Sequence, residues 1–329
     1  MKLAFFDTKP YDIPGFDRYA KPAGIEIKYF ESNLNIDTVS LAAGSDAVCV
    51  FVNDNITAEV VEKLYQLGVQ VIVLRCAGFN NVDLKACRGK LRVFRVPAYS
   101  PHAVAEHAMA LLLTVNRRIH KAHNRTREFN FSLQGLTGFD LYGKTVGVIG
   151  TGKIGRVFAD ICRGFGMKVL AYDKFPNPEA GLDYVELDEL FEKSDVISLH
   201  CPLTVETDHI IRSGSIRRMK DGVVIINTSR GGLVNSEDLI QGLKSGKVGA
   251  AALDVYEEEG EVFYEDLSGH ILQDDKLVRL IAMPNVIVTS HQAFLTKEAL
   301  DNIAHTTVNN LVRFFEGNPD VSTEVVYQK

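Results

Sequence analysis

Three consecutive apolar segments in the second half of the chain each end in a residue type that could take part in catalysis. The segment "GVVIIN" is followed by "TSRGG" with Arg230, "VGAAAL" by Asp254, and "NVIVTS" by His291. A guanidinium binds a carboxylate through two parallel hydrogen bonds, and an imidazole exchanges a proton near neutral pH. If the segments are parallel strands, their carboxyl ends share the sheet edge where ligands bind. The pattern predicts a site that binds an organic acid and transfers a proton.

An acidic run, "EEEGE" at 257–261, follows Asp254 closely. One of its carboxylates could hold the His291 imidazole and stabilise its charged form, but spacing alone does not select one of the three consecutive glutamates. Each feature also has a structural explanation when it is considered alone. Arg230 could form a surface ion pair, His291 could be a core histidine with a satisfied hydrogen bond, and the acidic run could be a solvated loop. Several such strand ends together favour a site.

The glycines Gly150, Gly152 and Gly155 form a GxGxxG pattern between an apolar strand and a helix. A second strand ends at Asp173, 18 residues after Gly155, in the context that a dinucleotide-binding fold requires. In that fold the glycines permit a tight turn, backbone approach to the pyrophosphate and helix–strand packing. The Asp173 carboxylate would accept hydrogen bonds from the ribose and repel a 2′-phosphate, which favours NAD over NADP. The adjacent Lys174 could weaken that preference.

Two alternations of short β-rich runs with helical segments must position these residues. The first contains "KLAFF", "IEIKYF", "DAVCVFV", "VQVIVL" and "LRVFRV", and the second extends from "TVGVIG" to "NVIVTS". Such alternation predicts an α/β fold with largely parallel sheets covered by helices. A long apolar helix is expected over 101–123, where a neighbouring domain or a second subunit must cover it. One more helix follows residue 296, and by its position it could return to the first domain.

Length and composition restrict the class of protein. The 329 residues suffice for two domains, and 46% apolar and 24% charged residues are typical of a soluble globular protein. The apolar runs are too short to span a membrane, and the net charge of −6 argues against a nucleic-acid surface. Five scattered cysteines predict a reducing, cytoplasmic location and no metal site. Charged residues and a proline interrupt the N-terminal segment where a signal peptide needs an apolar run.

Successive motifs make the chain similar to a known family. Over essentially the whole chain it resembles the D-isomer-specific 2-hydroxyacid dehydrogenases, in "RCAGFNNVD", "VPAYSPHAVAEHA", "GKTVGVIGTGKIG", "LHCPLT", "INTSRGGLVN", "ALDVYEEE" and "TSHQAFLT". The resemblance implies two Rossmann-like, doubly wound parallel-sheet domains, with the cofactor domain inserted into a discontinuous substrate domain. The implied boundaries are 1–100 and 297–329 for the substrate domain and 101–296 for the NAD-binding domain. The 101–123 helix would be a dimer contact.

The resemblance also implies roles for individual residues. Arg230 would bind the substrate carboxylate, His291 would be the acid–base, and Glu259, the fifth residue after Asp254, would be its partner. The residues expected to contact NAD are Gly150, Gly152, Lys153, Ile154, Gly155, Asp173, Cys201, Pro202, Thr207, Thr228, Ser229, Arg230 and Asp254. The residues expected to contact the substrate are Ala77 and Gly78, through their amides, and Tyr99, Phe51 and Phe294, which would line the pocket.

Three functions are compatible with these motifs. The leading hypothesis is reversible hydride transfer between NADH and pyruvate giving D-lactate, because "HQAFLT" differs from the HxGxxT pattern of the glycerate and phosphoglycerate members. An alternative in the same class prefers bulkier 2-oxoacids such as phenylpyruvate or 2-oxoisocaproate. An alternative from another class is an NAD-sensing, corepressor-like scaffold, which the short C-terminal tail disfavours. The expected partners are a small-molecule substrate and a second copy of the chain, as a homodimer or a homotetramer, and not a nucleic acid or a membrane.

Overall fold

The computed structural model describes residues 1–327 and divides into two compact units. Unit 1 combines Met1–Ser100 with Leu295–Lys329, and unit 2 is Pro101–Phe294. The chain therefore leaves unit 1, builds unit 2 as one continuous segment, and returns to unit 1 at its end. The predicted fold class, two parallel-sheet α/β domains with one inserted into the other, is confirmed.

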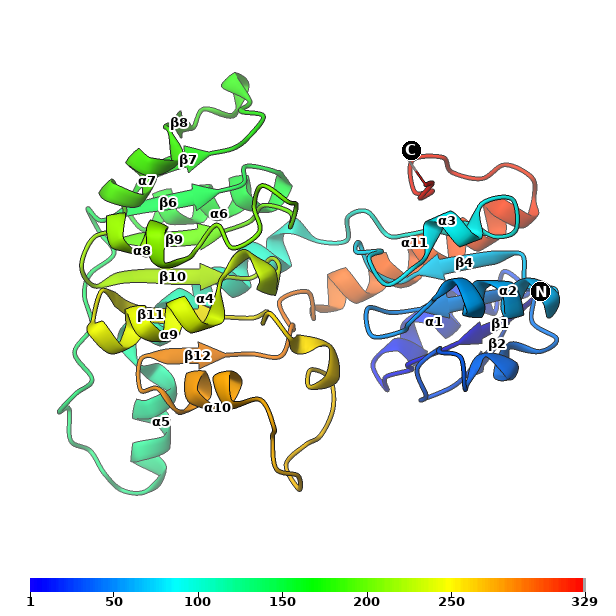
Figure 1. Ribbon diagram of the computed structural model, residues 1–329, viewed down its shortest axis with the longest axis horizontal. Coiled ribbons are helices and arrows are strands. Elements are labelled where there is room, and N and C mark those ends of the chain that lie inside the picture. The colour runs from blue at the N-terminus through cyan, green and yellow to red at the C-terminus, as the bar shows by residue number, and fades with distance from the viewer. Residues whose placement is uncertain (328–329) are drawn as a thin grey trace. The chain divides into compact units, whose positions relative to one another are not determined.

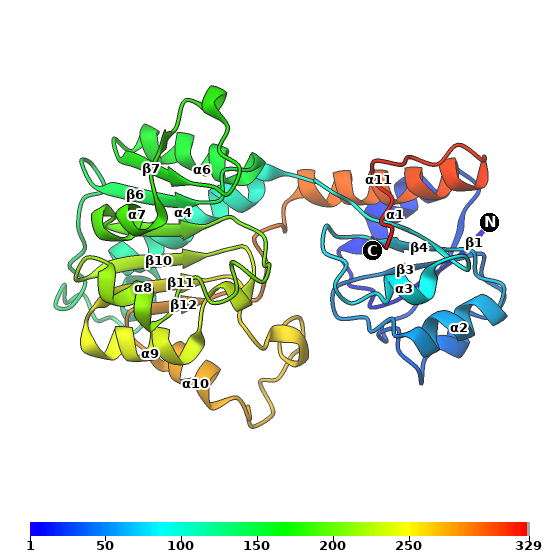
Figure 2. The same ribbon diagram turned by 45° about the horizontal axis from the view of Figure 1, so that its top comes forward.

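Unit 1 is built on a five-stranded parallel sheet in the order β2-β1-β3-β4-β5. Its strands are β1 (Lys2–Phe5), β2 (Glu26–Tyr29), β3 (Ala47–Val50), β4 (Val71–Leu74) and β5 (Arg92–Phe94). Its helices are α1 (Asp12–Ala20), α2 (Ala58–Gln66), α3 (Leu84–Cys87) and α11 (Lys297–Phe315), with a 3-10 turn at Val39–Ala42. Figure 2 shows α1 and α11 together on one side of this sheet, with α2 and α3 on the other. The returning helix thus completes the cover of the unit 1 sheet.

Unit 2 is built on a seven-stranded parallel sheet in the order β12-β11-β10-β9-β6-β7-β8 (Figure 1). Its strands are β6 (Thr145–Ile149), β7 (Lys168–Tyr172), β8 (Asp183–Tyr184), β9 (Val196–Leu199), β10 (Val223–Asn227), β11 (Val248–Leu253) and β12 (Val286–Val288). Its helices are α4 (Pro101–Arg117), α5 (Ile119–Arg127), α6 (Lys153–Gly164), α7 (Leu187–Lys193), α8 (Ser213–Arg218), α9 (Ser236–Ser245) and α10 (Asp275–Ala282), with 3-10 turns at Pro178–Ala180, Gly231–Leu233 and Glu259–Glu261. If the strands are numbered along unit 2, their order in the sheet is that of a dinucleotide-binding fold with one added strand, β12. Successive strands are added on one side of β6 as far as β8 and then on its other side from β9 onwards, so the strand order reverses between β6 and β9.

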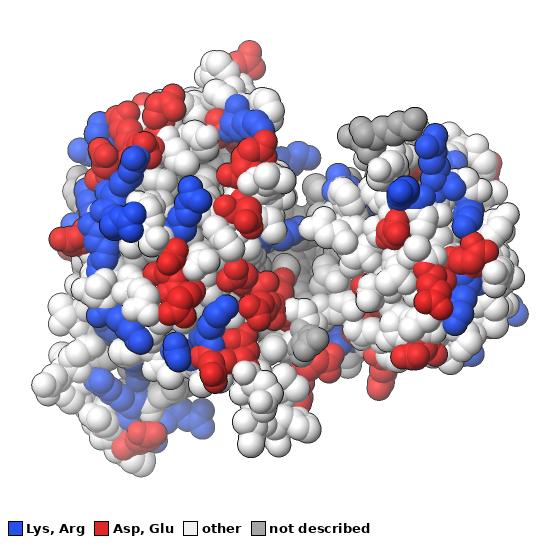
Figure 3. Space-filling model, viewed as in Figure 1, with Lys and Arg blue, Asp and Glu red and all other residues white. Residues whose placement is uncertain are grey.

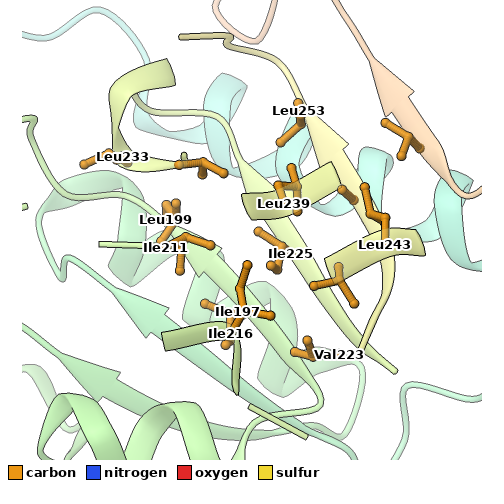
Figure 4. Close-up of a cluster of buried hydrophobic side chains, with 14 of the residues drawn as sticks. Ile197, Leu199, Ile211, Ile216, Val223, Ile225, Leu233, Leu239, Leu243 and Leu253 are labelled. Carbon is orange, nitrogen blue, oxygen red and sulfur yellow. The ribbon is translucent and has the colours of Figure 1, made fainter. Parts of the chain in front are cut away.

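Two apolar cores cover the two faces of the unit 2 sheet. Helices α4 and α6 pack on one face, and α7, α8, α9 and α10 pack on the other. Figure 4 shows part of the second core, where Ile197 and Ile225 of the sheet lie among Ile216 of α8 and Leu239 of α9. Because helices bury both faces, the strands are continuous apolar runs in the sequence. The candidate functional residues Arg230, Asp254 and His291 follow the ends of these strands.

The prediction of one continuous helix over 101–123 is wrong, because the structure has two helices there, α4 and α5. Helix α4 ends at Arg117, and Arg118 takes a left-handed backbone conformation (φ 51°) before α5 begins. The side chain of Asn116 accepts a hydrogen bond from Phe139 N (2.9 Å) and donates one to Phe139 O (2.8 Å). These bonds attach the connector to the last turn of α4, next to the break between the two helices. The Arg118 guanidinium also donates to Pro284 O at 3.1 Å, which holds the turn.

The surface carries charges of both signs. On the face shown in Figure 3, lysine and arginine are interspersed with aspartate and glutamate. This distribution accords with the net charge of −6. Within residues 1–327, no helix has the length and apolar character needed to cross a membrane.

Candidate active site

The ends of five parallel strands of unit 2 lie in register at one edge of the sheet. Ile149 of β6 pairs with Leu199 of β9, and Leu199 pairs with Asn227 of β10. Asn227 pairs in turn with Leu253 of β11, and Leu253 with Val288 of β12. The residues that follow these five positions are therefore neighbours, although up to about 140 residues of chain separate them. This edge carries the GxGxxG turn, Arg230, Asp254 and His291.

The structure brings His291 and Glu259 into direct contact. The His291 Nδ1 atom lies 2.9 Å from Glu259 Oε1, and Glu259 Oε2 accepts a hydrogen bond from Tyr256 N at 3.0 Å. Both side chains are about one-fifth exposed, so the pair is partly shielded from water while one side stays open. With Nδ1 engaged by the carboxylate, Nε2 is the nitrogen left to exchange a proton with a ligand. The geometry is that of an imidazole oriented by a carboxylate.

His291 occupies a left-handed backbone conformation (φ 52°) that the buried carboxylate of Asp254 holds in place. Asp254 Oδ1 accepts from Thr289 Oγ1 at 2.5 Å and from Gln292 N at 2.9 Å, and Oδ2 accepts from Ala293 N at 2.8 Å. The His291 amide donates to Asp254 O at 2.7 Å. Because these bonds reach residues on both sides of His291, Asp254 sets the direction in which the imidazole points. The sequence indicated Asp254 only as a cofactor contact, and its side-chain bonds show this additional structural role.

Asp254 remains ionised despite its complete burial. Burial alone would raise the pKa of this carboxyl, but hydrogen bonds from His107, Thr289 and the Ala293 amide lower the pKa below its usual value. His107 on α4 places its Nε2 atom 3.4 Å from Asp254 Oδ1 and 3.3 Å from Thr289 Oγ1. The apolar character of the α4 sequence concealed His107, and nothing in its spacing indicated that it faces this carboxylate.

The three consecutive glutamates have three different partners. Glu257 Oε1 lies 2.6 Å from His209 Nε2, Glu258 lies 3.5 Å from Lys276 Nζ, and Glu259 contacts His291. The backbone between β11 and the 3-10 turn at Glu259–Glu261 thus sends successive side chains in different directions. Only Glu259 reaches the imidazole, as the family resemblance implies and as spacing alone could not decide.

Arg230 lies at the end of β10 in an extended conformation (φ −141°, ψ 137°). Its guanidinium is half-buried and donates from Nη1 to Ser229 O at 2.7 Å. Among the residues whose side chains the structure describes, no carboxylate pairs with it. A Cβ at the next residue, Gly231, would lie 1.9 Å from Tyr256 O, so only glycine lets the Arg230 loop pack against the segment that carries Glu259. Arg230 is thus available for a ligand carboxylate.

The GxGxxG turn forms at the point where the strand order reverses. Gly150 has φ 94°, and a Cβ there would lie 2.5 Å from Cys201 N at the end of β9. A Cβ on Gly155 would lie 2.0 Å from Gly150 O, so this glycine allows α6 to pack on the turn. A Cβ on Gly152 would meet nothing within 4 Å, and Gly152 caps α6 without a side chain. The open N-terminus of α6 therefore fits a pyrophosphate.

The first turn of α6 carries two further residues expected to contact NAD. Lys153 is exposed at the first position of the helix, and Ile154 is half-buried behind it. An exposed ammonium at a helix N-terminus adds positive charge where phosphate groups would lie. Both positions are compatible with the expected contacts.

Asp173 is bonded to the glycine-rich turn itself. Its Oδ2 atom accepts from Thr151 N at 2.6 Å and from Thr151 Oγ1 at 2.9 Å, and its Oδ1 atom accepts from Phe175 N at 2.9 Å. Tyr184 of the short strand β8 contacts Thr151 Oγ1 at 2.9 Å. Sequence reasoning missed Thr151 and Tyr184, although Thr151 stands inside the GxGxxG pattern. Asp173 therefore ties the end of β7 to the glycine-rich turn, and its contact with the ribose stays a prediction.

Lys174 is paired with a carboxylate from another loop. Its Nζ atom lies 2.9 Å from Glu206 Oε1, and Glu206 also accepts from Thr204 Oγ1 at 2.8 Å. Hydrogen bonds from Lys174 and Thr204 lower the pKa of Glu206 to about 2. Because the ammonium already faces an anion, it is less able to weaken the preference for NAD than its sequence position suggests.

The remaining expected NAD contacts lie at the ends of β9 and β10. Burial raises the pKa of the Cys201 thiol to about 11, so the thiol is neutral. Thr207 Oγ1 donates to Pro202 O at 2.7 Å and closes the loop that follows β9. The Thr228 hydroxyl is buried and has no hydrogen-bond partner among the described residues. Such an orphaned group at the ligand edge fits a cofactor contact.

Four of the five expected substrate contacts belong to unit 1. The backbone after β4 is held through its carbonyls, because Ala77 O accepts from Arg95 Nη1 at 2.8 Å and Gly78 O accepts from the Cys76 thiol at 3.3 Å. The structure gives the amides of residues 77 and 78 no hydrogen-bond partner within 1–327. This backbone therefore has two donors to offer a carboxylate.

Phe51 and Tyr99 are held by polar groups in unit 1. Phe51 N donates to Asp54 Oδ2 at 2.5 Å, and its ring lies 4.6 Å from the Arg75 guanidinium. Burial raises the pKa of Asp54 to about 7, against the opposing charge of Arg75. Tyr99 O accepts from Asn302 Nδ2 of α11 at 2.7 Å. The fifth residue, Phe294, is buried at the end of unit 2.

A dinucleotide-binding sheet whose ligand edge carries a carboxylate-held imidazole is the arrangement expected of a nicotinamide-dependent oxidoreductase. Comparison with known proteins agrees. Residues 109–293 match the NAD binding domain of D-isomer specific 2-hydroxyacid dehydrogenases. The chain is 51% identical over 321 residues to D-lactate dehydrogenase of Escherichia coli, covering 96% of this chain and 98% of that protein. The chain belongs to the D-isomer-specific 2-hydroxyacid dehydrogenase family.

Solved structures give the same relationship. The apo-structure of the E. coli D-lactate dehydrogenase superposes with a TM-score of 0.91 at 49% identity, covering 99% of this chain and all of that one. The structure described for the pyruvate reductase of Chlamydomonas reinhardtii superposes with a TM-score of 0.93 at 43% identity, covering 97% of each chain. The predicted enzyme class, NAD cofactor and small hydroxyacid substrate are therefore confirmed, and the corepressor-like alternative is not supported.

Proposed function

We propose that this chain is a D-lactate dehydrogenase that catalyses reversible hydride transfer between NADH and pyruvate. The observation that carries the proposal is the 2.9 Å contact between His291 Nδ1 and Glu259 Oε1 at the edge that also holds Arg230. The similarity to proteins described as a D-lactate dehydrogenase and a pyruvate reductase supports pyruvate as the substrate. The alternative that prefers bulkier 2-oxoacids is tested below.

Three side chains have separate roles in this proposal. When bound, NADH supplies the hydride that reduces the C2 carbonyl. Arg230 binds the substrate carboxylate through both prongs of its guanidinium and so fixes the orientation of the carbonyl. His291 donates the Nε2 proton to the forming alkoxide, and Glu259 stabilises the imidazolium before this transfer. In the reverse direction neutral His291 accepts the hydroxyl proton of lactate.

The first prediction concerns substrate size. The residues expected to contact the substrate include three aromatic side chains, Phe51, Tyr99 and Phe294, and a hydrophobic pocket discriminates against each extra methylene by about 1–3 kcal/mol. We expect the specificity constant to fall from pyruvate to 2-oxobutyrate and again to phenylpyruvate when NADH oxidation is followed. Values that stay equal or rise with substrate size would favour the enzyme for bulkier 2-oxoacids.

The second prediction concerns the choice of cofactor. We expect Asp173→Ser to raise the use of NADPH relative to NADH, because the carboxylate no longer repels a 2′-phosphate. The comparison is the ratio of specificity constants for the two cofactors. Asp173→Asn is the matched variant: it removes the charge but keeps an acceptor for the Thr151 bonds. A wild-type enzyme that already used both cofactors equally would contradict the role of Asp173.

We further propose that the enzyme is a homodimer, alone or paired into a tetramer. Helix α5 has no buried residue, and Phe129, Phe131 and Leu133 just after it are 83%, 71% and 80% exposed. Several exposed large apolar side chains in one segment outside the sheet are typical of a subunit contact. Sedimentation of the full chain would test this, and a monomer at micromolar concentration would contradict it.

We also propose that the enzyme works in the cytoplasm. All five cysteines are buried free thiols, as expected in a reducing compartment. Fractionation of the source cells, with the activity assayed in each fraction, would test this location. Activity that sedimented with membranes or was exported would contradict it.

A further inference from the structure

A second imidazole–carboxylate pair lies in the same acidic segment, two residues before Glu259. His209 Nε2 lies 2.6 Å from Glu257 Oε1, and the other carboxylate oxygen accepts from Ser236 N, the first residue of α9, at 3.2 Å. The side chains are 30% and 22% exposed. Asp208 also lies near this imidazole, with Oδ2 at 3.7 Å from His209 Nδ1. The proposed proton transfer uses none of these groups.

Glu257 is held as an anion. Burial alone would raise the pKa of Glu257, but hydrogen bonds from Ser236 and His209 lower the pKa below its ordinary value. His209 is also fixed through its backbone, which has φ 48° and donates to Gly232 O at 2.9 Å. The pair therefore joins three segments: the loop after β9, the Arg230 loop with the start of α9, and the segment after β11.

The backbone at Tyr256 and Glu257 contacts both Glu259 and the loop that carries Arg230. Tyr256 N, in the residue next to Glu257, donates to Glu259 Oε2 at 3.0 Å, while Glu259 Oε1 faces His291. Tyr256 O lies so close to Gly231 that no Cβ fits between them. A shift of the 256–257 backbone would therefore displace Glu259 on one side and the Arg230 loop on the other.

We propose that His209 and Glu257 are positioning residues that fix the 256–257 backbone and thereby hold Glu259 against His291. The inference rests on the proposed function, since it assumes that Glu259 and His291 act as the acid–base pair. In this proposal His209 and Glu257 neither bind the substrate nor transfer the proton. They act through the hydrogen bond from Tyr256 to Glu259.

The test compares Glu257→Gln and Glu259→Gln, alone and combined, in the kcat and KM of pyruvate reduction and in NADH binding. Glu259→Gln should lower kcat, because His291 loses the carboxylate that orients its imidazole. Glu257→Gln should lower kcat by a smaller factor, because Glu259 is held less firmly. The expected fall for Glu257→Gln is about tenfold to a hundredfold, as loss of alignment produces, with the KM for pyruvate and the dissociation constant for NADH unchanged. The double variant should show the kcat of Glu259→Gln and no further loss.

Glu258→Gln is the matched control, because Glu258 is 63% exposed and its ion-pair partner among the described residues is Lys276, at 3.5 Å. It should leave kcat and the KM for pyruvate as in the wild type. A Glu257→Gln enzyme that behaves like Glu258→Gln overturns the inference, and so does a further fall in kcat in the double variant, which would mean that Glu257 acts independently of Glu259. If Glu259→Gln itself leaves kcat unchanged, the acid–base pair of the proposed function is wrong as well. Thermal unfolding of each variant identifies any that fails to fold, and His209→Gln then takes the place of Glu257→Gln.

Discussion

Replacing His291 by Gln lowers both pyruvate reduction and D-lactate oxidation by roughly 10²–10⁴-fold, the range expected when a general acid–base is removed. Both directions fall together because the same imidazole donates the proton in one and accepts it in the other. NADH binding should persist, because the glycine-rich turn and Asp173 do not depend on this side chain. Steady-state rates in both directions and a fluorescence titration with NADH measure the two effects separately.

The left-handed backbone at His291 calls for a second variant. Asn tolerates φ near 50° better than Gln does, so His291→Asn separates loss of the proton donor from strain in the turn. Both variants should lose activity to a similar extent. His270→Gln, at an exposed position, is the control and should keep wild-type rates. Substantial activity in His291→Asn would exclude His291 from proton transfer.

The second large effect is expected from Arg230→Lys. Lysine keeps the charge but loses the planar, two-pronged donor, so the substrate carboxylate is bound less firmly and the carbonyl is less well oriented. A charge-assisted hydrogen bond contributes about 1.5–3 kcal/mol, and its loss corresponds to a roughly 10–100-fold lower kcat/KM for pyruvate. The KM for pyruvate should rise and the dissociation constant for NADH should not.

Arg217→Lys provides the matched control, because Arg217 is an exposed arginine of α8 in the same unit. Its kcat/KM should equal that of the wild type. If Arg230→Lys left the KM for pyruvate unchanged while NADH still bound, Arg230 would not be the carboxylate ligand. The half-buried guanidinium would then serve the loop alone, through its bond to Ser229 O.

The sequence predicted the parts of the fold that depend on continuous apolar runs. Strands β6, β9, β10, β11 and β12 were expected because helices bury both of their faces. Strand β8 was missed, since two residues, Asp183–Tyr184, leave no periodic pattern. The break at Arg118 was missed because no glycine or proline stands there, and the contact of Asn116 with Phe139 beside it joins residues 23 positions apart.

The residues of the candidate site could be predicted where they directly follow a strand, because the ends of parallel strands meet at one edge of the sheet. Arg230, Asp254 and His291 were identified because each follows an apolar strand, whereas the choice of Glu259 required the family resemblance. His209 and His107 were missed, because their carboxylate partners lie 48 and 147 residues away in the sequence. Asp254 orients His291 mainly through hydrogen bonds to backbone amides. Because every residue except proline has such an amide, the residue types in the sequence could not predict these bonds.

The hydrogen bonds of Asp254 also restrict where insertions and deletions can occur in the chain. Its carboxylate accepts hydrogen bonds from Thr289, Gln292 and Ala293, so an insertion or deletion within 289–293 would take at least one donor out of reach. Between Asp254 and Thr289, by contrast, the chain passes through the irregular segment 262–274 before α10 and β12 return it to the sheet. Relatives that differ in length in this half of the chain should therefore differ within 262–274, and graft designs should keep 289–293 intact as a single five-residue unit.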